Sequence, residues 1–313
     1  MTESTAIGGS VDVSQSGSIA TLTLSNPGRR NTMTEAMWRA LEPACARLAD
    51  DASVRAVVVR GAGTDFSAGA DISDLRAILK DEDSGHHDGG AVAAGEAALA
   101  GLHKPTIAAV EGYCLGGAWQ IAAASDIRLA SSDATFGITP AKIGIVYPTA
   151  GIERLVRIAG PATAKYLLFS GDFVDAERAR VLGLVQAVHP AETFWDEVDT
   201  FVQRLAARSQ LSIQAMKDIV DTVVSSGTGE TGAGDLQAAS NHWQHLMATT
   251  GDAQTGIGAF LAKQTPEFTW NGGPGTSRRS AEHGAKEGVH ADTGAGIRTA
   301  PDTDAGRGVM SEP

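Results

Sequence analysis

The sequence has little that could cross-link the chain or anchor it in a membrane. Cys45 and Cys114 are its only cysteines, too few for a disulfide framework. Both lie among apolar residues, so we expect two buried thiols rather than a catalytic cysteine. No apolar run is long enough to span a bilayer, and residues 1–10 lack the basic and apolar stretches of a signal peptide. A soluble, cytoplasmic protein is the expectation.

Basic residues are also scarce. The chain carries 25 Lys and Arg against 37 Asp and Glu, a formal net charge of -12. A surface of this sign disfavours non-specific binding to nucleic acid, although it leaves room for a small basic pocket that holds a phosphate-bearing ligand. The sequence has no CxxC, HExxH or P-loop motif, and we expect no metal site.

The first part of the chain contains patterns typical of strands and of one amphipathic helix. Residues 11–13 and 19–24 are typical of a hairpin whose second strand buries every other residue. The spacing of Thr32 and Glu35 matches a capping box, after which we expect a helix. Residues 56–59 are apolar throughout, which favours a strand buried on both faces of a parallel sheet.

A similar order recurs further along. A predicted helix over 91–102 leads to a second buried strand over 105–110, a glycine-rich turn, a helix over 118–124 and a third strand over 127–129. Alternation of buried strands with helices indicates an α/β fold. In such sheets ligands bind beyond the carboxyl ends of the strands, which is where both glycine-rich turns of this chain occur.

The pattern becomes mainly helical downstream. We expect residues 11–200 to form the α/β core and 201–271 a helical region, flanked by a flexible N-terminus at 1–10 and a disordered tail at 272–313. Helices are predicted over 162–168, 176–181, 194–208, 212–224, 236–247 and 255–263.

Two glycine-rich turns, residues 66–72 and 112–120, are the most informative part of the sequence. The first contains Ala70, and the second contains Gly117 just ahead of a predicted helix. Glycine lets the backbone approach a ligand closely, and a helix that begins near Gly117 adds the partial positive charge of its N-terminus. Two backbone N–H groups that converge on one point can hold a thioester oxygen as it becomes an enolate.

These turns resemble the two signature regions of the crotonase (enoyl-CoA hydratase/isomerase) superfamily. Segments 26–31, 125–128 and 256–263 resemble other parts of its members, so the similarity runs from Val11 to Trp270. The resemblance implies a core of repeated ββα units, assembly as a homotrimer or homohexamer through the helical region, and acyl-CoA substrates with no further cofactor. It also implies that Ala70 and Gly117 donate the two N–H groups.

The resemblance further implies where coenzyme A binds. Arg30, Ala68, Asp71 and Ile72 lie in segments that correspond to its contacts, and Lys263 matches a region that can reach its phosphates on a neighbouring subunit. From the residues alone, Lys263 is equally compatible with a solvated cation at a helix end, and Asp71 with the cap of the helix after the first turn. Whether coenzyme A or a carrier protein bears the thioester stays open.

Two positions depart from the hydratase pattern. The glutamates that hydratases of this superfamily carry correspond to Gln120 and Pro140, and neither side chain can act as a general acid or base. The stretch from Thr139 to Tyr147 resembles the methylmalonyl-CoA decarboxylases of the superfamily, which implies that Tyr147 reaches the reacting group. Those enzymes have histidine at the position of Ala70 and glutamate at that of Gln120, so neither pattern fits fully.

These observations favour an enzyme that stabilises a thioester enolate, with Ala70, Gly117, Gln120 and Tyr147 as catalytic residues. We slightly prefer decarboxylation of a malonyl-type acyl-CoA, because loss of CO₂ needs no base. The alternatives are a hydratase or isomerase that uses another acid or base, Glu111 or Tyr147, and a non-catalytic acyl-thioester-binding accessory subunit. For Glu111 a structural hydrogen bond to the second turn is the other interpretation.

Overall fold

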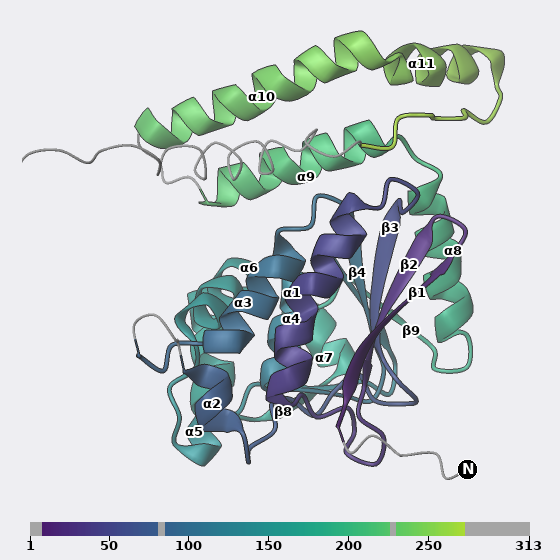
Figure 1. Cartoon of the computed structure of the whole chain (residues 1–313). Helices are drawn as coiled ribbons and strands as arrows, with labels where there is room; N and C mark the ends of the chain where they lie inside the picture. Colours follow the sequence, from purple (N-terminus) through teal and green to yellow (C-terminus); the bar gives the residue numbers. More distant parts are fainter. Residues whose placement is uncertain (1–7, 81–84, 226–229, 273–313) are drawn as a thin grey trace, which may run out of the picture.

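A six-stranded sheet forms the centre of the protein (Figure 1). The computed structural model describes residues 8–80, 85–225 and 230–272, so all but the first residue of the predicted tail and most of the predicted flexible N-terminus lie outside the described residues. The sheet has the spatial order β1 (Ser10–Ser16), β2 (Ile19–Ser25), β3 (Ala56–Gly61), β4 (Thr106–Val110), β6 (Ile127–Ser131) and β9 (Ala187–His189). A smaller sheet consists of β5 (Tyr113–Leu115), β7 (Thr135–Gly137) and β8 (Phe173–Asp175).

The large sheet has the burial that the sequence predicts. β1 pairs with β2 in antiparallel fashion, and the neighbours from β2 to β9 pair in parallel. Ala20, Leu22 and Leu24 on one face of β2 are fully buried. β3 and β4 lie inside the sheet and are buried on both faces, which explains why their residues do not alternate between apolar and polar.

Helices cover both faces of this sheet (Figure 1). On one face, Met37, Leu41 and Leu48 of α1 pack into the main core together with residues of α3 and α4. On the other face, Phe194 and Val198 of α8 pack against apolar residues of β3, β4 and β6. The α/β prediction is therefore confirmed. The helices are α1 (Glu35–Asp50), α2 (Leu75–Leu79), α3 (Gly90–Ala100), α4 (Gly117–Ala124), α5 (Pro140–Ile143), α6 (Thr149–Ser170), α7 (Ala176–Val181), α8 (Phe194–Ala206), α9 (Gln210–Ser225), α10 (Glu230–Thr250) and α11 (Asp252–Ala262).

Both cysteines are free and buried, as expected. Burial raises the pKa of the Cys45 thiol to about 12, and burial raises the pKa of Cys114 still further. Neither side chain is a thiolate at neutral pH, which fits a packing role.

The start of α1 differs from the prediction. Thr34, rather than Thr32, is the N-cap, and its hydroxyl accepts a hydrogen bond from the N–H of Met37 at 3.4 Å. The hydroxyl of Thr32 instead donates to the carbonyl of Arg29 at 2.6 Å and so closes the loop before the helix. The predicted capping box was wrong, because either threonine precedes the apolar pattern at a plausible distance. Glu35 is still in the first turn, where its charge complements the helix dipole.

The short elements in the middle of the chain escaped the sequence reasoning. β5, β7, β8 and β9 contain three residues each, too few for a recognisable alternation. α6 begins at Thr149 and contains a break at Gly160, where φ is 79° and ψ is 163°, followed by Pro161. The prediction of a helix over 162–168 therefore found only the part after the break. Two strands precede a helix in β1-β2-α1, β4-β5-α4 and β6-β7-α5, whereas β3 is followed directly by α2.

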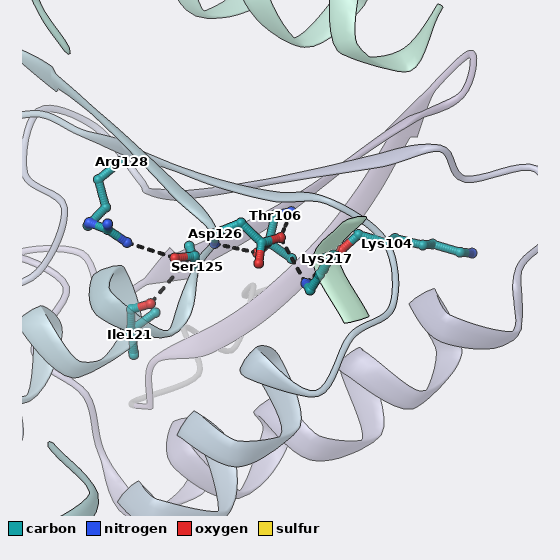
Figure 2. A network of polar contacts seen from close by, with 7 residues as sticks. All are labelled: Lys104, Thr106, Ile121, Ser125, Asp126, Arg128 and Lys217. Carbon is teal, nitrogen blue, oxygen red and sulfur yellow. Dashed lines mark hydrogen bonds and ion pairs between the residues drawn. The ribbon is translucent and has the colours of Figure 1, made fainter. Parts of the chain in front are cut away.

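The C-terminal helices α9, α10 and α11 lie at the amino ends of the parallel strands (Figure 1). Arg55, just before β3, donates to the carbonyl of Phe268 at 3.4 Å. Figure 2 shows Lys217 of α9 beside the carboxylate of Asp126, which it approaches to 2.8 Å and which also accepts the N–H of Thr106. These contacts tie the helical region to the end of the sheet opposite the glycine-rich turns. Among the described residues, no helix combines the length and the apolarity needed to cross a bilayer.

His103, in the connection between α3 and β4, lowers the stability of the folded protein at low pH. Burial first, and then the ammonium groups of Lys104 and Lys217, lower the pKa of His103 to about 4. Between that value and the ordinary value of about 6.5, the unfolded chain binds a proton that the folded chain does not. Stability is therefore expected to rise as the pH rises through this window, by about 3 kcal/mol from this group alone.

Replacing His103 by Gln tests this expectation. Denaturant unfolding of both proteins at several pH values between 4 and 6.5 gives their free energies of unfolding. We expect the variant to gain less stability over this range than the unaltered chain. Equal gains in the two proteins would show that His103 does not titrate differently in the folded and unfolded states.

Candidate active site

The first glycine-rich turn, after β3, is held by backbone hydrogen bonds to the loop before α1. The N–H of Met33 donates to the carbonyl of Gly69 at 2.7 Å, and the N–H of Asp71 donates to the carbonyl of Met33 at 2.8 Å. The N–H of Ala70, between them, faces away from Met33, as in a parallel bridge. Gly69 has a φ of +99°, and a side chain there would come within 2.6 Å of the Leu115 carbonyl, so this position requires glycine.

The second turn leads from β4 through β5 to α4 and lies directly beside the first. Ser67 donates its N–H to the carbonyl of Tyr113 at 2.8 Å, and Leu115 donates to the carbonyl of Ser67 at 3.1 Å. This short parallel bridge connects the two turns. The N–H of Gly116 donates to the carbonyl of Gly137 at 2.8 Å, after which α4 begins at Gly117. Both turns lie beyond the carboxyl ends of parallel strands, as predicted.

The structure brings the N–H groups of Ala70 and Gly117 close together. A methyl group on Gly117 would lie 3.3 Å from the nitrogen of Ala70, and one on Gly69 would lie 3.4 Å from the nitrogen of Gly117. Within residues 8–80, 85–225 and 230–272, neither N–H donates a hydrogen bond. Most backbone N–H groups in folded proteins have a partner. Two unpaired neighbours of this kind can donate to one carbonyl or anionic oxygen.

Trp38 of α1 packs against the second turn at Gly117. A methyl group on Gly117 would lie 3.0 Å from its Cζ2 atom, and the indole is fully buried. Sequence reasoning placed an apolar helix face here without assigning this residue a place at the site. Trp119 of α4 is also buried, with its ring edge-on to Phe136, the centroids 6.3 Å apart.

Gln120 is held by a carboxylate that the sequence reasoning missed. Its Nε2 donates to Oε2 of Glu96, on α3, at 3.1 Å, and Nε of Arg154, on α6, donates to Oε1 of the same carboxylate at 2.6 Å. Glu96 is 1% exposed. Unpaired carboxylates are seldom buried, so its burial depends on these two partners. It is also the only titratable residue of α3, and this lone charge in an alanine-rich helix was the signal that could have identified it.

Tyr147 lies just before α6 with its ring buried. Its hydroxyl donates to the carbonyl of Gly116 at 2.7 Å. Burial first, and then the nearby carboxylate of Glu96, raises the pKa of Tyr147 well above its ordinary value. The hydroxyl therefore keeps its proton near neutral pH. It donates a hydrogen bond to the peptide group that joins Gly116 to Gly117.

Neither Pro140 nor Glu111 places a titratable group beside the two amides. Pro140 is the buried first residue of α5. The carboxylate of Glu111 accepts a hydrogen bond from Nε1 of Trp195 at 2.8 Å, on the α8 side of the sheet, and burial raises the pKa of this carboxyl group. A bond from the Glu111 side chain to the second turn was a wrong prediction. Its backbone carbonyl instead accepts the N–H of Phe66.

Four of the five predicted coenzyme A contacts lie in or beside the first turn: Arg30, Ala68, Asp71 and Ile72. The guanidinium of Arg30 stacks on the ring of Tyr113, 4.6 Å from its centroid, and the carbonyl of Arg30 accepts the N–H of Ala68 at 2.9 Å. Ile72 is 70% exposed. The Arg30 side chain is also exposed, and an exposed cation and an exposed apolar side chain can contact a ligand that has both phosphates and a ring.

Asp71 does not cap a helix, contrary to the prediction. Its Oδ1 accepts the N–H and the hydroxyl of Ser73 at 3.1 and 2.7 Å, and its Oδ2 lies 2.8 Å from the guanidinium of Arg29. These bonds from Ser73 and, more weakly, the charge of Arg29 lower the pKa of Asp71. α2 follows Asp74 instead, because the chain first makes a tight turn at Ser73.

Lys263 lies far from these residues within one chain. It ends α11 in a left-handed conformation with a φ of 52°, and α11 lies at the opposite end of the molecule from α2 and α5 (Figure 1). Its contact with coenzyme A on a neighbouring subunit stays a prediction.

A cavity of about 600 Å³ lies between α9, the C-terminal ends of α3 and α4, and the first half of α6. Arg154 and Lys217 line it, but no residue of 66–72 or 112–120 does. This cavity is therefore separate from the paired amides.

Comparison with known proteins identifies the family of the chain. The family model described as enoyl-CoA hydratase/isomerase matches residues 14–271. The chain belongs to the enoyl-CoA hydratase/isomerase family. It is 31% identical over 261 residues to a 2,3-dehydroadipyl-CoA hydratase of Escherichia coli strain K12, a match that covers 82% of this chain and 97% of that relative.

Solved structures of the family share the fold. A crystal structure of an enoyl-CoA hydratase/isomerase family member superposes with a TM-score of 0.79 at 38% identity, covering 84% of this chain and 98% of the other. An enoyl-CoA hydratase from Polaromonas sp. JS666 superposes with a TM-score of 0.73 at 27% identity, covering 83% and 100%. The similarity thus includes nearly all of the described residues.

The paired amides predict the effect of removing one of them. Gly117→Pro deletes one N–H at the first position of α4, where proline fits a helix. We expect kcat for thioester turnover to fall about 10²- to 10³-fold. Gly117→Ala is the matched control, because it adds a comparable carbon next to Trp38 and keeps the N–H. A proline variant as active as the alanine variant, with both close to the unaltered chain, would argue against a role for this N–H.

Proposed function

We propose that the chain is an enzyme that binds an acyl-CoA thioester and stabilises its enolate. The N–H groups of Ala70 and Gly117 donate to the thioester oxygen and share the negative charge that develops on it. The observation that carries this proposal is their closeness: two unpaired backbone donors whose nitrogens face the same small space. Membership of the enoyl-CoA hydratase/isomerase family supports the same class of substrate.

The electrostatics of the second turn support this role. Gly117 begins α4, whose N-terminus carries a partial positive charge. Tyr147 donates to the Gly116 carbonyl and thus keeps the peptide before Gly117 in one orientation. Preorganised donors of this kind commonly contribute about 3–4 kcal/mol each to stabilisation of the transition state.

Decarboxylation of a malonyl-type acyl-CoA is the reaction we prefer. The bond between the α-carbon and the carboxylate breaks, CO₂ leaves, and the electron pair moves onto the thioester oxygen that the two amides hold. A water then gives its proton to the α-carbon, and solvent neutralises the hydroxide that remains. This sequence needs no general base, which fits a site that has Gln120 and Pro140 where hydratases have glutamates.

The role of Tyr147 in this reaction depends on its hydrogen bond to Gly116. A hydroxyl that donates to Gly116 does not at the same time donate to a substrate carboxylate, so orienting the carboxylate requires the hydroxyl to rotate. While its hydroxyl donates to the Gly116 carbonyl, Tyr147 acts instead on the position of the Gly117 N–H. Either role requires the hydroxyl group.

Hydration or isomerisation of an enoyl-CoA is the second candidate. Relatives that share about a third of the sequence are named as hydratases, and Glu96 places a carboxylate next to Gln120. Glu111, the acid or base first considered for this reaction, loses support because its carboxylate binds Trp195. A non-catalytic acyl-thioester-binding subunit is the remaining alternative.

The proposal extends to partners and place of action. Arg30, Ala68, Asp71 and Ile72 bind the coenzyme A of one active site, and Lys263 of a neighbouring subunit reaches its phosphates. This requires a homotrimer or homohexamer, and we expect it to act in the cytoplasm, on coenzyme A or carrier-protein thioesters, with no cofactor beyond the substrate.

A mass measurement of products tests the proposal. The purified chain is incubated separately with methylmalonyl-CoA and crotonyl-CoA, and the thioesters are weighed by mass spectrometry. We expect a product lighter by one CO₂ from the first substrate, and a slower reaction in Tyr147→Phe. A crotonyl-CoA product heavier by one water would favour hydration instead. Binding of both thioesters without turnover would favour the accessory subunit, and no binding at all would refute the proposal.

A further inference from the structure

We infer that Glu96 is a positioning residue, which fixes the amide of Gln120 so that its carbonyl oxygen holds a water beside the thioester. The inference rests on the proposed function, because it assigns a task to a side chain of the same site. It concerns Glu96 itself, which touches neither of the paired amides.

Glu96 decides which end of the Gln120 amide points toward α3. An ionised carboxylate only accepts hydrogen bonds, so it binds the NH₂ end of an amide and repels the oxygen. The Nε2 of Gln120 is 3.1 Å from Oε2 of Glu96. Arg154 donates to the other carboxylate oxygen at 2.6 Å, so both oxygens of Glu96 accept hydrogen bonds. The orientation of the amide therefore follows from its partner.

The packing around Gln120 leaves its oxygen on the other side. A methyl group on Gly151, in α6, would lie 2.5 Å from Nε2 of Gln120 and 2.9 Å from the ring of Tyr147. The NH₂ end is thus enclosed by Glu96 and by a glycine that leaves just enough room. In the described part of the chain, the oxygen Oε1 of Gln120 accepts no hydrogen bond, although this side chain is 2% exposed.

The helix geometry brings this oxygen toward the thioester. Gln120 comes three residues after Gly117 and four after Gly116, so its side chain lies on the same face of α4. Side chains of a helix lean toward its N-terminus, which here is the end with the Gly117 N–H. An amide oxygen in that place accepts a hydrogen bond from a water. In decarboxylation that water supplies the proton for the α-carbon, and in hydration it supplies the oxygen.

Kinetics of Glu96→Gln test this role. The variant keeps the size of the side chain but lets either end of the Gln120 amide face α3. We expect kcat to fall about tenfold, which corresponds to about 1.4 kcal/mol, while KM changes less. Glu153→Gln is the matched control. It removes an exposed carboxylate that is adjacent to Arg154 in the sequence but pairs with Arg157. If both variants keep the full kcat, Glu96 has no positioning role.

The swapped variant, Glu96→Gln with Gln120→Glu, covers the case in which the single variant fails to fold. It preserves one carboxylate and one amide in contact, so we expect its melting temperature to lie close to that of the unaltered chain. Its kcat should gain a new acidic limb, because residue 120 then titrates. A swapped variant with the kcat and the pH profile of the unaltered chain would overturn the inference.

A side-chain amide resonance separates this inference from the proposed function. The ¹H–¹⁵N signals of Gln120, assigned by their loss in Gln120→Met, should show slow hydrogen exchange that becomes faster in Glu96→Gln. If the chain converts no thioester but shows this protection, the proposed function fails and the pairing stands. If the chain is active and the resonance is the same in both proteins, the inference alone fails.

Discussion

The site depends on a short backbone bridge that fixes two turns side by side. Ser67 pairs with the β5 strand through its N–H and carbonyl groups, and Met33 pairs with the other edge of the first turn. The bonds to Met33 use the carbonyl of Gly69 and the N–H of Asp71. They leave the N–H of Ala70 unpaired. The same constraint explains Gly69, because only a residue without Cβ fits against the Leu115 carbonyl. The paired amides are thus a consequence of strand pairing rather than of any single side chain.

The sequence sufficed to predict the features that depend on periodicity and on glycine. The alternation over 19–24, the all-apolar run over 56–59 and the two turns each correspond to the observed elements. The hydrogen bonds of individual polar side chains were harder to predict, because neighbouring side chains with similar polar groups compete for the same partner. Thr34 rather than Thr32 caps α1, and Asp71 binds Ser73 rather than a helix. Which of two neighbours makes a bond depends on loop geometry that a one-dimensional pattern does not contain.

The carboxylate of Glu96 illustrates what a motif comparison leaves out. The resemblance implies that Gln120 and Pro140 occupy the two positions where the family's hydratases have glutamates. Folding brings Glu96 of α3 and Arg154 of α6 to Gln120 of α4, although they are far apart in sequence. The site therefore has a buried charge next to position 120, held by an ion pair, and Gln120 presents its amide in one orientation. Gln120 therefore keeps this position polar, although its amide cannot act as a general acid or base.

The central claim is that two backbone N–H groups polarise a thioester carbonyl. Infrared difference spectroscopy measures this polarisation directly, with an acyl-CoA labelled with ¹³C at the thioester carbonyl and bound to the protein. Hydrogen bonds to the oxygen weaken the C=O bond, so the account predicts a stretching band at a lower wavenumber than in water. A band at the position found in water, or above it, would contradict the account.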